Sequence, residues 1–180
     1  MINILYTVER IGPYHNARFN SVSKSKGVNI NVLETNSLSN RYPWEENFNQ
    51  LYKVFKLSNT NIKNLKLQTK KEVKKILKES LPDIVYISGW NEKVSHYLLF
   101  ICQLKKIPVV ILSDSRYKDS KRIIFFELIK KFLLKGCTTA LVAGKESENY
   151  LIQLGFKKAN IFKPYNVVDN KYFCTHEINI

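Results

Sequence analysis

A chain of 180 residues, 44% of them hydrophobic and 12% aromatic, can bury one substantial core, which excludes an intrinsically disordered protein. Its 29 lysines and arginines exceed its 15 acidic residues, and the formal net charge of +14 favours anionic partners: nucleic acid, anionic lipid or phosphorylated substrates. The three cysteines form no C-x-x-C pair, as expected in a reducing cytosol, and no apolar run approaches the roughly 20 residues that cross a bilayer. We therefore expect a cytoplasmic protein without a membrane span.

Short apolar runs alternate with amphipathic stretches along the chain. Because each run is nearly continuous in apolar character, it is typical of a strand covered on both faces. The predicted strands are residues 2–8, 28–34, 83–88, 108–113, 139–143 and, with a weaker pattern, 160–164. The predicted helices between them are residues 15–27, 68–82, 91–106 and 121–136, with Gly27, Pro82 and Gly136 as stop signals.

This alternation predicts an α/β fold, a single Rossmann-like domain with a mostly parallel sheet covered by helices on both faces. Residues 36–66 are longer and less regular than a plain crossover, and they predict an inserted surface loop with a short helix. No repeat and no linker rich in glycine, serine or proline divides the chain.

Ligands of an open parallel sheet bind beyond the carboxyl ends of its strands, so the loops there are the candidate sites. They are residues 9–18, 88–93, 113–119 and 143–147. The first loop contains Gly12, Pro13, His15 and Arg18 at the start of a predicted helix, whose N–H groups favour a phosphate or a sugar hydroxyl. A lone histidine on a loop is more often structural or solvated, and that alternative stays open for His15.

Two further loops carry residue types that recognise sugars. Trp90 can stack on the apolar face of a sugar or simply pack against the core. Ser113, Asp114, Ser115 and Arg116 offer an acid, two hydroxyls and a guanidinium for polyhydroxyl or phosphate groups, and they equally suit a cap for the helix that follows.

Several chemistries lack their sequence signatures. There is no G-x-G-x-x-G fingerprint and no P-loop, so neither a dinucleotide cofactor nor an NTPase is expected. The histidines and cysteines show no spacing typical of metal ligands, and no G-x-S-x-G elbow indicates a hydrolase. We expect no metal site and no cofactor.

Six segments together resemble the amino-terminal domain of glycosyltransferase family four, retaining enzymes of the GT-B fold, particularly bacterial members that build cell-surface polysaccharides. These segments are GPYHNARF (12–19), RYPWEE (41–46), SGW (88–90), SDS (113–115) followed by Arg122, Glu127 and Lys131, ALVAGKESENYLIQLGF (140–156) and PYNVVDNKYF (164–173). In that family a phrase like the last one marks the crossing into a second domain, which binds the nucleotide sugar.

The resemblance implies a division of the chain and roles for its residues. Residues 1–173 would form the acceptor-side domain, and residues 174–180 would begin the carboxyl-terminal domain or form a disordered tail. Gly12 and Pro13 would approach the donor diphosphate, although the proline removes one backbone donor.

The side chains that would face the acceptor are His15, Arg18, Trp90 and Asn91. Asp114 lies where relatives often place a histidine near the reacting carbon, which makes it the candidate catalytic residue. Arg122, Glu127 and Lys131 would serve packing and ion pairing.

The expected function is therefore the acceptor-binding half of a glycosyltransferase, which uses a nucleotide sugar as co-substrate and is inactive without a donor-binding domain. Its partners would be a glycan or lipid-linked acceptor and a separate donor-binding domain or chain. Residues 121–135 mix apolar and basic side chains and would cover the sheet, or else rest on an anionic membrane at its inner face. The alternative is a non-catalytic basic module that binds nucleic acid or anionic lipid, although no nucleic-acid-binding motif accompanies the charge.

Overall fold

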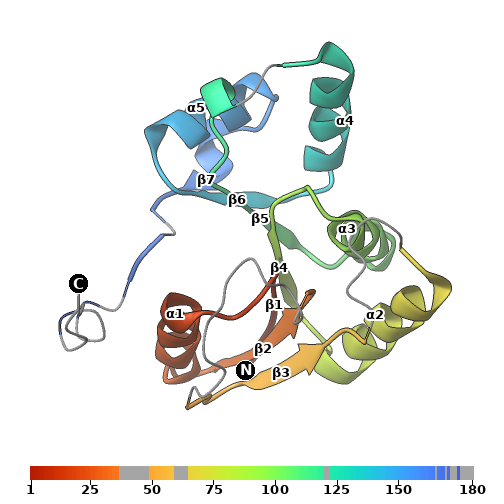
Figure 1. The fold of residues 1–180 in the computed structure, drawn as a ribbon, viewed down its shortest axis with the longest axis vertical. Helices are drawn as coiled ribbons and strands as arrows, with labels where there is room; N and C mark the ends of the chain where they lie inside the picture. The colour runs from red at the N-terminus through yellow and green to blue at the C-terminus, as the bar shows by residue number, and fades with distance from the viewer. Residues whose placement is uncertain are drawn as a thin grey trace, which may run out of the picture.

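The computed structural model describes residues 1–36, 49–58, 65–119, 122–164, 166–168, 170 and 174, which form one α/β domain around a seven-stranded parallel sheet (Figure 1). The strands are β1 (Ile2–Val8), β2 (Val28–Glu34), β3 (Lys53–Lys56), β4 (Ile84–Ser88), β5 (Val109–Ser113), β6 (Thr139–Val142) and β7 (Ile161–Phe162). The helices are α1 (Pro13–Ser23), α2 (Leu67–Ser80), α3 (Lys93–Lys105), α4 (Ile124–Leu134) and α5 (Lys145–Gln153), with short 3₁₀ turns η1 (Tyr117–Asp119) and η2 (Lys158–Asn160).

The strand order is β3-β2-β1-β4-β5-β6-β7, so the chain builds outward from β1 in one direction and then returns to build in the other. Every pair is parallel, with Ile4 opposite Ile30 on β2 and Ile84 on β4. The predicted Rossmann-like class is thereby confirmed. The order reverses between β1 and β4, and this is where such sheets open at their carboxyl edge.

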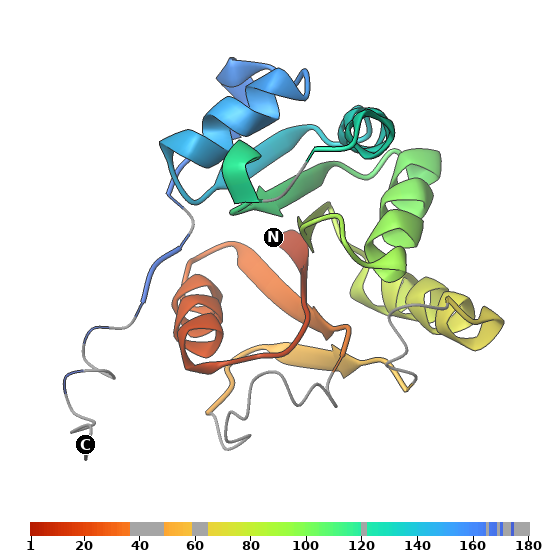
Figure 2. The ribbon, with the colours of Figure 1, turned by 45° about the horizontal axis from the view of Figure 1, so that its top comes forward.

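Alternate side chains of the strands enter two cores on opposite faces of the sheet. Leu5 of β1 belongs to the larger core, which α2, α3 and α5 cover with residues such as Leu98 and Leu151. Tyr6 and Val8 belong to the smaller core, where Phe19 of α1 is 1% exposed. Figure 2 shows α1 on the side of the sheet away from α2 and α3.

Three sequence expectations need correction. Residues 53–56 form the edge strand β3, where a loop was predicted. The remainder of the 36–66 segment is described only at residues 36, 49–52, 57–58 and 65–66, so RYPWEE (41–46) lies outside the described residues. Helix α1 ends at Ser23, and Gly27, with φ of 80°, forms the turn into β2 instead of ending the helix. The loop predicted at residues 143–147 already contains the start of α5.

The largest departure concerns α4. The first of the two sequence expectations was that its apolar residues cover the sheet, but Leu134 is the only residue of α4 that is fully buried. Figure 1 shows α4 at the outer edge of the domain. Most of its large apolar side chains are exposed. None of the helices in the described part of the chain has the length and apolarity required to cross a membrane.

Candidate functional site at the carboxyl edge of the sheet

A cleft of about 600 Å³ opens at the switch point between β1 and β4. Its walls come from the carboxyl ends of β1, β4 and β5, the first turns of α1, and residues 166–168 near the carboxyl end of the chain. The volume lies in the range typical of small-molecule sites. The topology therefore places the cleft where the strand order alone predicts a ligand.

The first wall is the β1–α1 connection, which a buried glutamate holds in place. Glu34, at the end of β2, is 4% exposed; its Oε1 accepts the Ile11 N–H at 2.8 Å, and its Oε2 lies 3.7 Å from Lys56 Nζ. A buried carboxylate needs such partners, so the loop conformation is tied to the end of β2. This contact directs Glu9 and Arg10 to the cleft.

His15 forms part of the same wall in its neutral state. Its Nδ1 accepts the Gly12 N–H at 3.2 Å, in the manner of a helix capping box. Burial, and to a smaller extent the charge of the nearby Arg18 guanidinium, together lower the pKa of His15 to about 3. With Nδ1 as the acceptor, the remaining ring proton is on Nε2, so His15 presents a donor that does not change near neutral pH.

The second wall is the β4–α3 connection. Ser88 N–H donates to Thr7 Oγ1 at 3.0 Å, which holds the end of β4 against β1. Gly89 has φ of 72°, a left-handed conformation that favours glycine, and its N–H donates to Leu112 O at 2.9 Å. This turn brings Trp90 to the cleft, where its ring also packs on the larger core.

Glu92, at the start of α3, is a cleft carboxyl that the sequence analysis did not single out. Burial raises its pKa, a hydrogen bond from Thr35 opposes the shift, and the charge of Glu9 adds to it. A carboxyl with a raised pKa in a cleft is a typical feature of functional sites. In the sequence, only the position of Glu92 within the candidate loop 88–93 indicates that it could belong to the site.

The third wall follows β5. Ser113 is 3% exposed, and its Oγ accepts the Ser115 N–H at 3.3 Å. Asp114 is exposed to the cleft, and its backbone oxygen accepts the Ser147 hydroxyl at 2.9 Å, which ties the loop to α5.

The structure separates the predicted site residues into two groups. Those that line the cleft are His15, Arg18, Trp90, Asn91, Ser113, Asp114 and Ser115. Those that do not are Gly12, Pro13 and Arg116. The Gly12 N–H donates to His15 and Pro13 has no N–H, so the first turn of α1 offers fewer donors to an anion than predicted.

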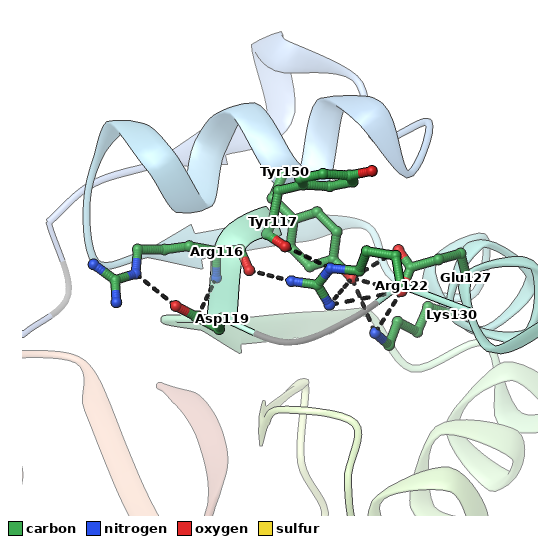
Figure 3. A network of polar contacts seen from close by, with 7 residues as sticks. All are labelled: Arg116, Tyr117, Asp119, Arg122, Glu127, Lys130 and Tyr150. Atoms are coloured by element: carbon green, nitrogen blue, oxygen red, sulfur yellow. Dashed lines mark hydrogen bonds and ion pairs between the residues drawn. The ribbon is translucent and has the colours of Figure 1, made fainter. Parts of the chain in front are cut away.

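Arg116 turns away to a local ion pair instead. Its Nε lies 2.9 Å from Asp119 Oδ1, its side chain is 62% exposed, and its backbone oxygen accepts from the Arg122 guanidinium (Figure 3). The expected ion pairing of Arg122 and Glu127 is present at 3.7 Å. The lysine that completes the group is Lys130, 2.8 Å from Glu127, in place of Lys131.

Twelve residues that were not among the predicted site residues complete the walls of the cleft. They are Tyr6, Val8, Glu9, Arg10, Tyr14, Ser88, Gly89, Glu92, Leu112, Asn166, Val167 and Val168. The cleft thus combines two arginines, three carboxyls, amides, hydroxyls and aromatic rings. No group of metal-binding side chains occurs among the described residues.

Comparisons with known proteins give a fold and no family. No protein-family model matches the chain, and no curated protein matches it. Solved structures do match: MnaA of S. aureus in complex with UDP has a TM-score of 0.62 and 12% identity over 89% of this chain and 43% of that one. A UDP-N-acetylglucosamine 2-epimerase has a TM-score of 0.60 and 12% identity, over 90% of this chain and 48% of the epimerase. The Neisseria meningitidis UDP-GlcNAc 2-epimerase bound to UDP-GlcNAc has a TM-score of 0.54 and 14% identity, over 88% of this chain and 44% of the epimerase.

These similarities establish a half-domain of the GT-B-like type, which the epimerases share with glycosyltransferases. The chain spans less than half the length of each of these neighbours.

Proposed function

We propose that this domain acts in nucleotide-sugar chemistry and forms the acceptor-binding side of a glycosyltransferase of the GT-B fold. The observation that supports it is the cleft, in which carboxyls, guanidinium groups, an amide and Trp90 meet at the switch point. This set of groups suits a polyhydroxyl ligand, because hydroxyls need both donors and acceptors and a sugar face needs an aromatic ring.

In this proposal the carboxyls have separate tasks. Asp114 is the candidate catalytic residue, because it stands exposed in the cleft with its backbone fixed by Ser147. Glu92, whose pKa burial raises, is suited to exchange a proton with an acceptor hydroxyl. The arginines would stabilise negative charge that develops on a leaving diphosphate.

The proposal also holds that sugar transfer needs a donor-binding domain in addition to residues 1–180. The structural neighbours are more than twice as long as the part that matches this chain. The chain alone should therefore bind an acceptor glycan without transferring sugar or hydrolysing a sugar nucleotide. Turnover by the purified chain well above background, with contaminating enzyme excluded, would contradict this part of the proposal.

Calorimetric titration of the chain with a panel of glycans and with UDP-GlcNAc tests the acceptor site. Asp114→Asn and Asn91→Ala should weaken glycan binding about tenfold, a loss typical of a missing hydrogen bond to a charged or polar partner. These residues are exposed, whereas Trp90 also packs on the core, so their replacement leaves the fold intact. Arg116→Gln is the matched control, because Arg116 lies outside the cleft, and it should change affinity less than twofold.

The other outcomes decide against the proposal in distinct ways. Tight binding of UDP-GlcNAc without any glycan would assign the cleft to the nucleotide sugar instead of the acceptor. Strongly salt-dependent binding of a nucleic-acid duplex without any glycan response would favour the basic-module alternative. Equal losses of glycan affinity in Arg116→Gln and Asp114→Asn would show that the glycan does not bind specifically in the cleft.

A further inference from the structure

Helix α4 turns two of its charged residues, Glu127 and Lys130, toward the domain. The side chains of Glu127 and Lys130 are only 21% and 19% exposed, and both contact the hydroxyl of Tyr150 on α5, at 2.8 and 2.9 Å (Figure 3). Arg122, just before the helix, donates to the same hydroxyl at 3.0 Å. With Leu134, these contacts fix which side of α4 faces inward.

The opposite side of α4 is apolar and faces solvent. We call Ile124, Phe125, Leu128, Ile129 and Phe132 the α4 face; their exposed fractions are 79%, 66%, 59%, 39% and 74%. Residues 124, 128 and 132 are spaced by four and form one stripe on a helix. A contiguous apolar patch of this kind marks an interaction surface, because soluble proteins rarely leave one in water.

The charges around the α4 face identify its partner. Glu127 is the only acid in α4 and is engaged on the inner side, whereas Lys131 and Lys135 are exposed. These two lysines also line a cavity of about 300 Å³, with Gly155 and Phe156 at the end of α5. An anionic group therefore finds two cations and a recess beside the apolar stripe.

A second copy of the chain is a poor partner for this face. It would bring the same lysines and another net charge of +14 to the contact. An anionic bilayer matches both features, because apolar side chains enter the boundary of the acyl region while lysines meet the headgroup phosphates.

We infer that the α4 face docks the domain on an anionic phospholipid bilayer, with Lys131 and Lys135 at the headgroups. The inference rests on the exposure and charge of α4 and is independent of the proposed function of the cleft. Of the two sequence expectations for residues 121–135, it adopts the anionic membrane instead of cover for the sheet.

Co-sedimentation of the full chain with vesicles tests this inference. The chain should bind vesicles of phosphatidylcholine that contain about one third phosphatidylglycerol, and bind pure phosphatidylcholine far more weakly. Phe125→Ser/Phe132→Ser should lower the partition coefficient at least about tenfold. Lys131→Gln/Lys135→Gln should lower it about 25-fold on anionic vesicles, since each lysine near such a surface contributes roughly fivefold.

Matched controls lie on α2, which is also basic. Leu67, 69% exposed, and the exposed pair Lys71 and Lys74 provide Leu67→Ser and Lys71→Gln/Lys74→Gln, which should each change the partition coefficient less than twofold. Thermal unfolding of every variant should match that of the parent, because all the replaced side chains are exposed.

Several results would overturn the inference. Failure of the parent chain to bind anionic vesicles is one, and undiminished binding by Phe125→Ser/Phe132→Ser is another. Equal losses of the partition coefficient in the α2 controls would show that binding depends on the overall charge and hydrophobicity of the chain and not on the α4 face. Self-association without lipid that Phe125→Ser/Phe132→Ser abolishes would assign the α4 face to a second copy.

Discussion

His15 shows how one side chain serves both the local backbone and the cleft. As an unprotonated acceptor of the Gly12 N–H it caps α1, and as a donor through Nε2 it faces the ligand space. Protonation would place a poorly solvated cation beside Arg18, so burial and the charge of Arg18 both lower the pKa of His15.

This arrangement makes folding stability depend on the protonation of His15. The pKa is about 3 in the folded chain and about 6.5 when unfolded, so below pH 6.5 the unfolded chain binds a proton that the folded chain does not. Stability is complete above pH 6.5 and should fall as the pH drops toward 3, with the unfolding constant rising about tenfold per pH unit from this residue.

The variant His15→Gln isolates that contribution, because glutamine keeps an acceptor for the Gly12 N–H without titrating. Urea unfolding at pH 7, 6, 5 and 4 should show that the parent loses stability more steeply than the variant below pH 6.5. Parallel pH profiles of the two proteins would contradict the assigned protonation state.

At the scale of elements, the sequence predicts six of the seven strands and misses the edge strand β3. β1 and β2 have the predicted bounds, because both are continuous apolar runs. β3 is a four-residue edge strand of sequence KVFK, and its terminal lysines give it the appearance of a loop. Charged residues on an edge strand prevent pairing with a further strand. The same lysines that protect this edge therefore made the strand hard to predict.

The orientation of α4 is unpredictable from periodicity for a different reason. The sequence shows an amphipathic helix but not which side has partners, and the decisive partner, Tyr150, lies in a helix 20 residues away from Lys130. Burial tends to raise the pKa of Glu127, but hydrogen bonds from Lys130 and Tyr150 and the charges of Lys130 and Arg122 outweigh it and lower the pKa. A charged cluster thus takes the place that an apolar stripe usually has.

The cluster should stabilise the domain through its carboxylate. Glu127→Gln leaves Arg122 and Lys130, 13% and 19% exposed, without their counterion, and should lower the free energy of unfolding by about 2–3 kcal/mol. Tyr150→Phe keeps the ion pairs and should cost about 1 kcal/mol.

Urea unfolding measures both losses. Glu79→Gln is the control, because the pairs that Glu79 makes with Lys53 and Lys75 are exposed and should contribute less than about 0.5 kcal/mol. A loss in Glu127→Gln no greater than in Glu79→Gln would mean that the cluster does not hold α4.

At the scale of the whole molecule, strand order creates the cleft. The order in which strands are added to the sheet reverses between β1 and β4. The connections after β1, β4 and β5 therefore diverge around one space. The general rule let the sequence locate these loops and residues such as Asn91 and Ser113. The rule did not locate residues 166–168. Their place in the cleft wall depends on the path of the chain after β7, an edge strand that is not next to β1, β4 or β5.

Residues 166–168 should therefore matter to binding more than to stability. Val167 and Val168 are 50% and 61% exposed, so they add little to either core, while Lys163 pairs with Glu148 and anchors the chain just before them. A chain that ends after Pro164 should unfold within about 3 °C of the parent, since the loss in stability is below about 1 kcal/mol. The same truncation should weaken glycan binding several-fold, because one wall of the cleft is removed. Calorimetry measures the unfolding temperature and the affinity on the same sample. Unchanged affinity would show that the ligand site is confined to the β1, β4 and β5 connections, and a large fall in the unfolding temperature would show that the segment belongs to the folded core.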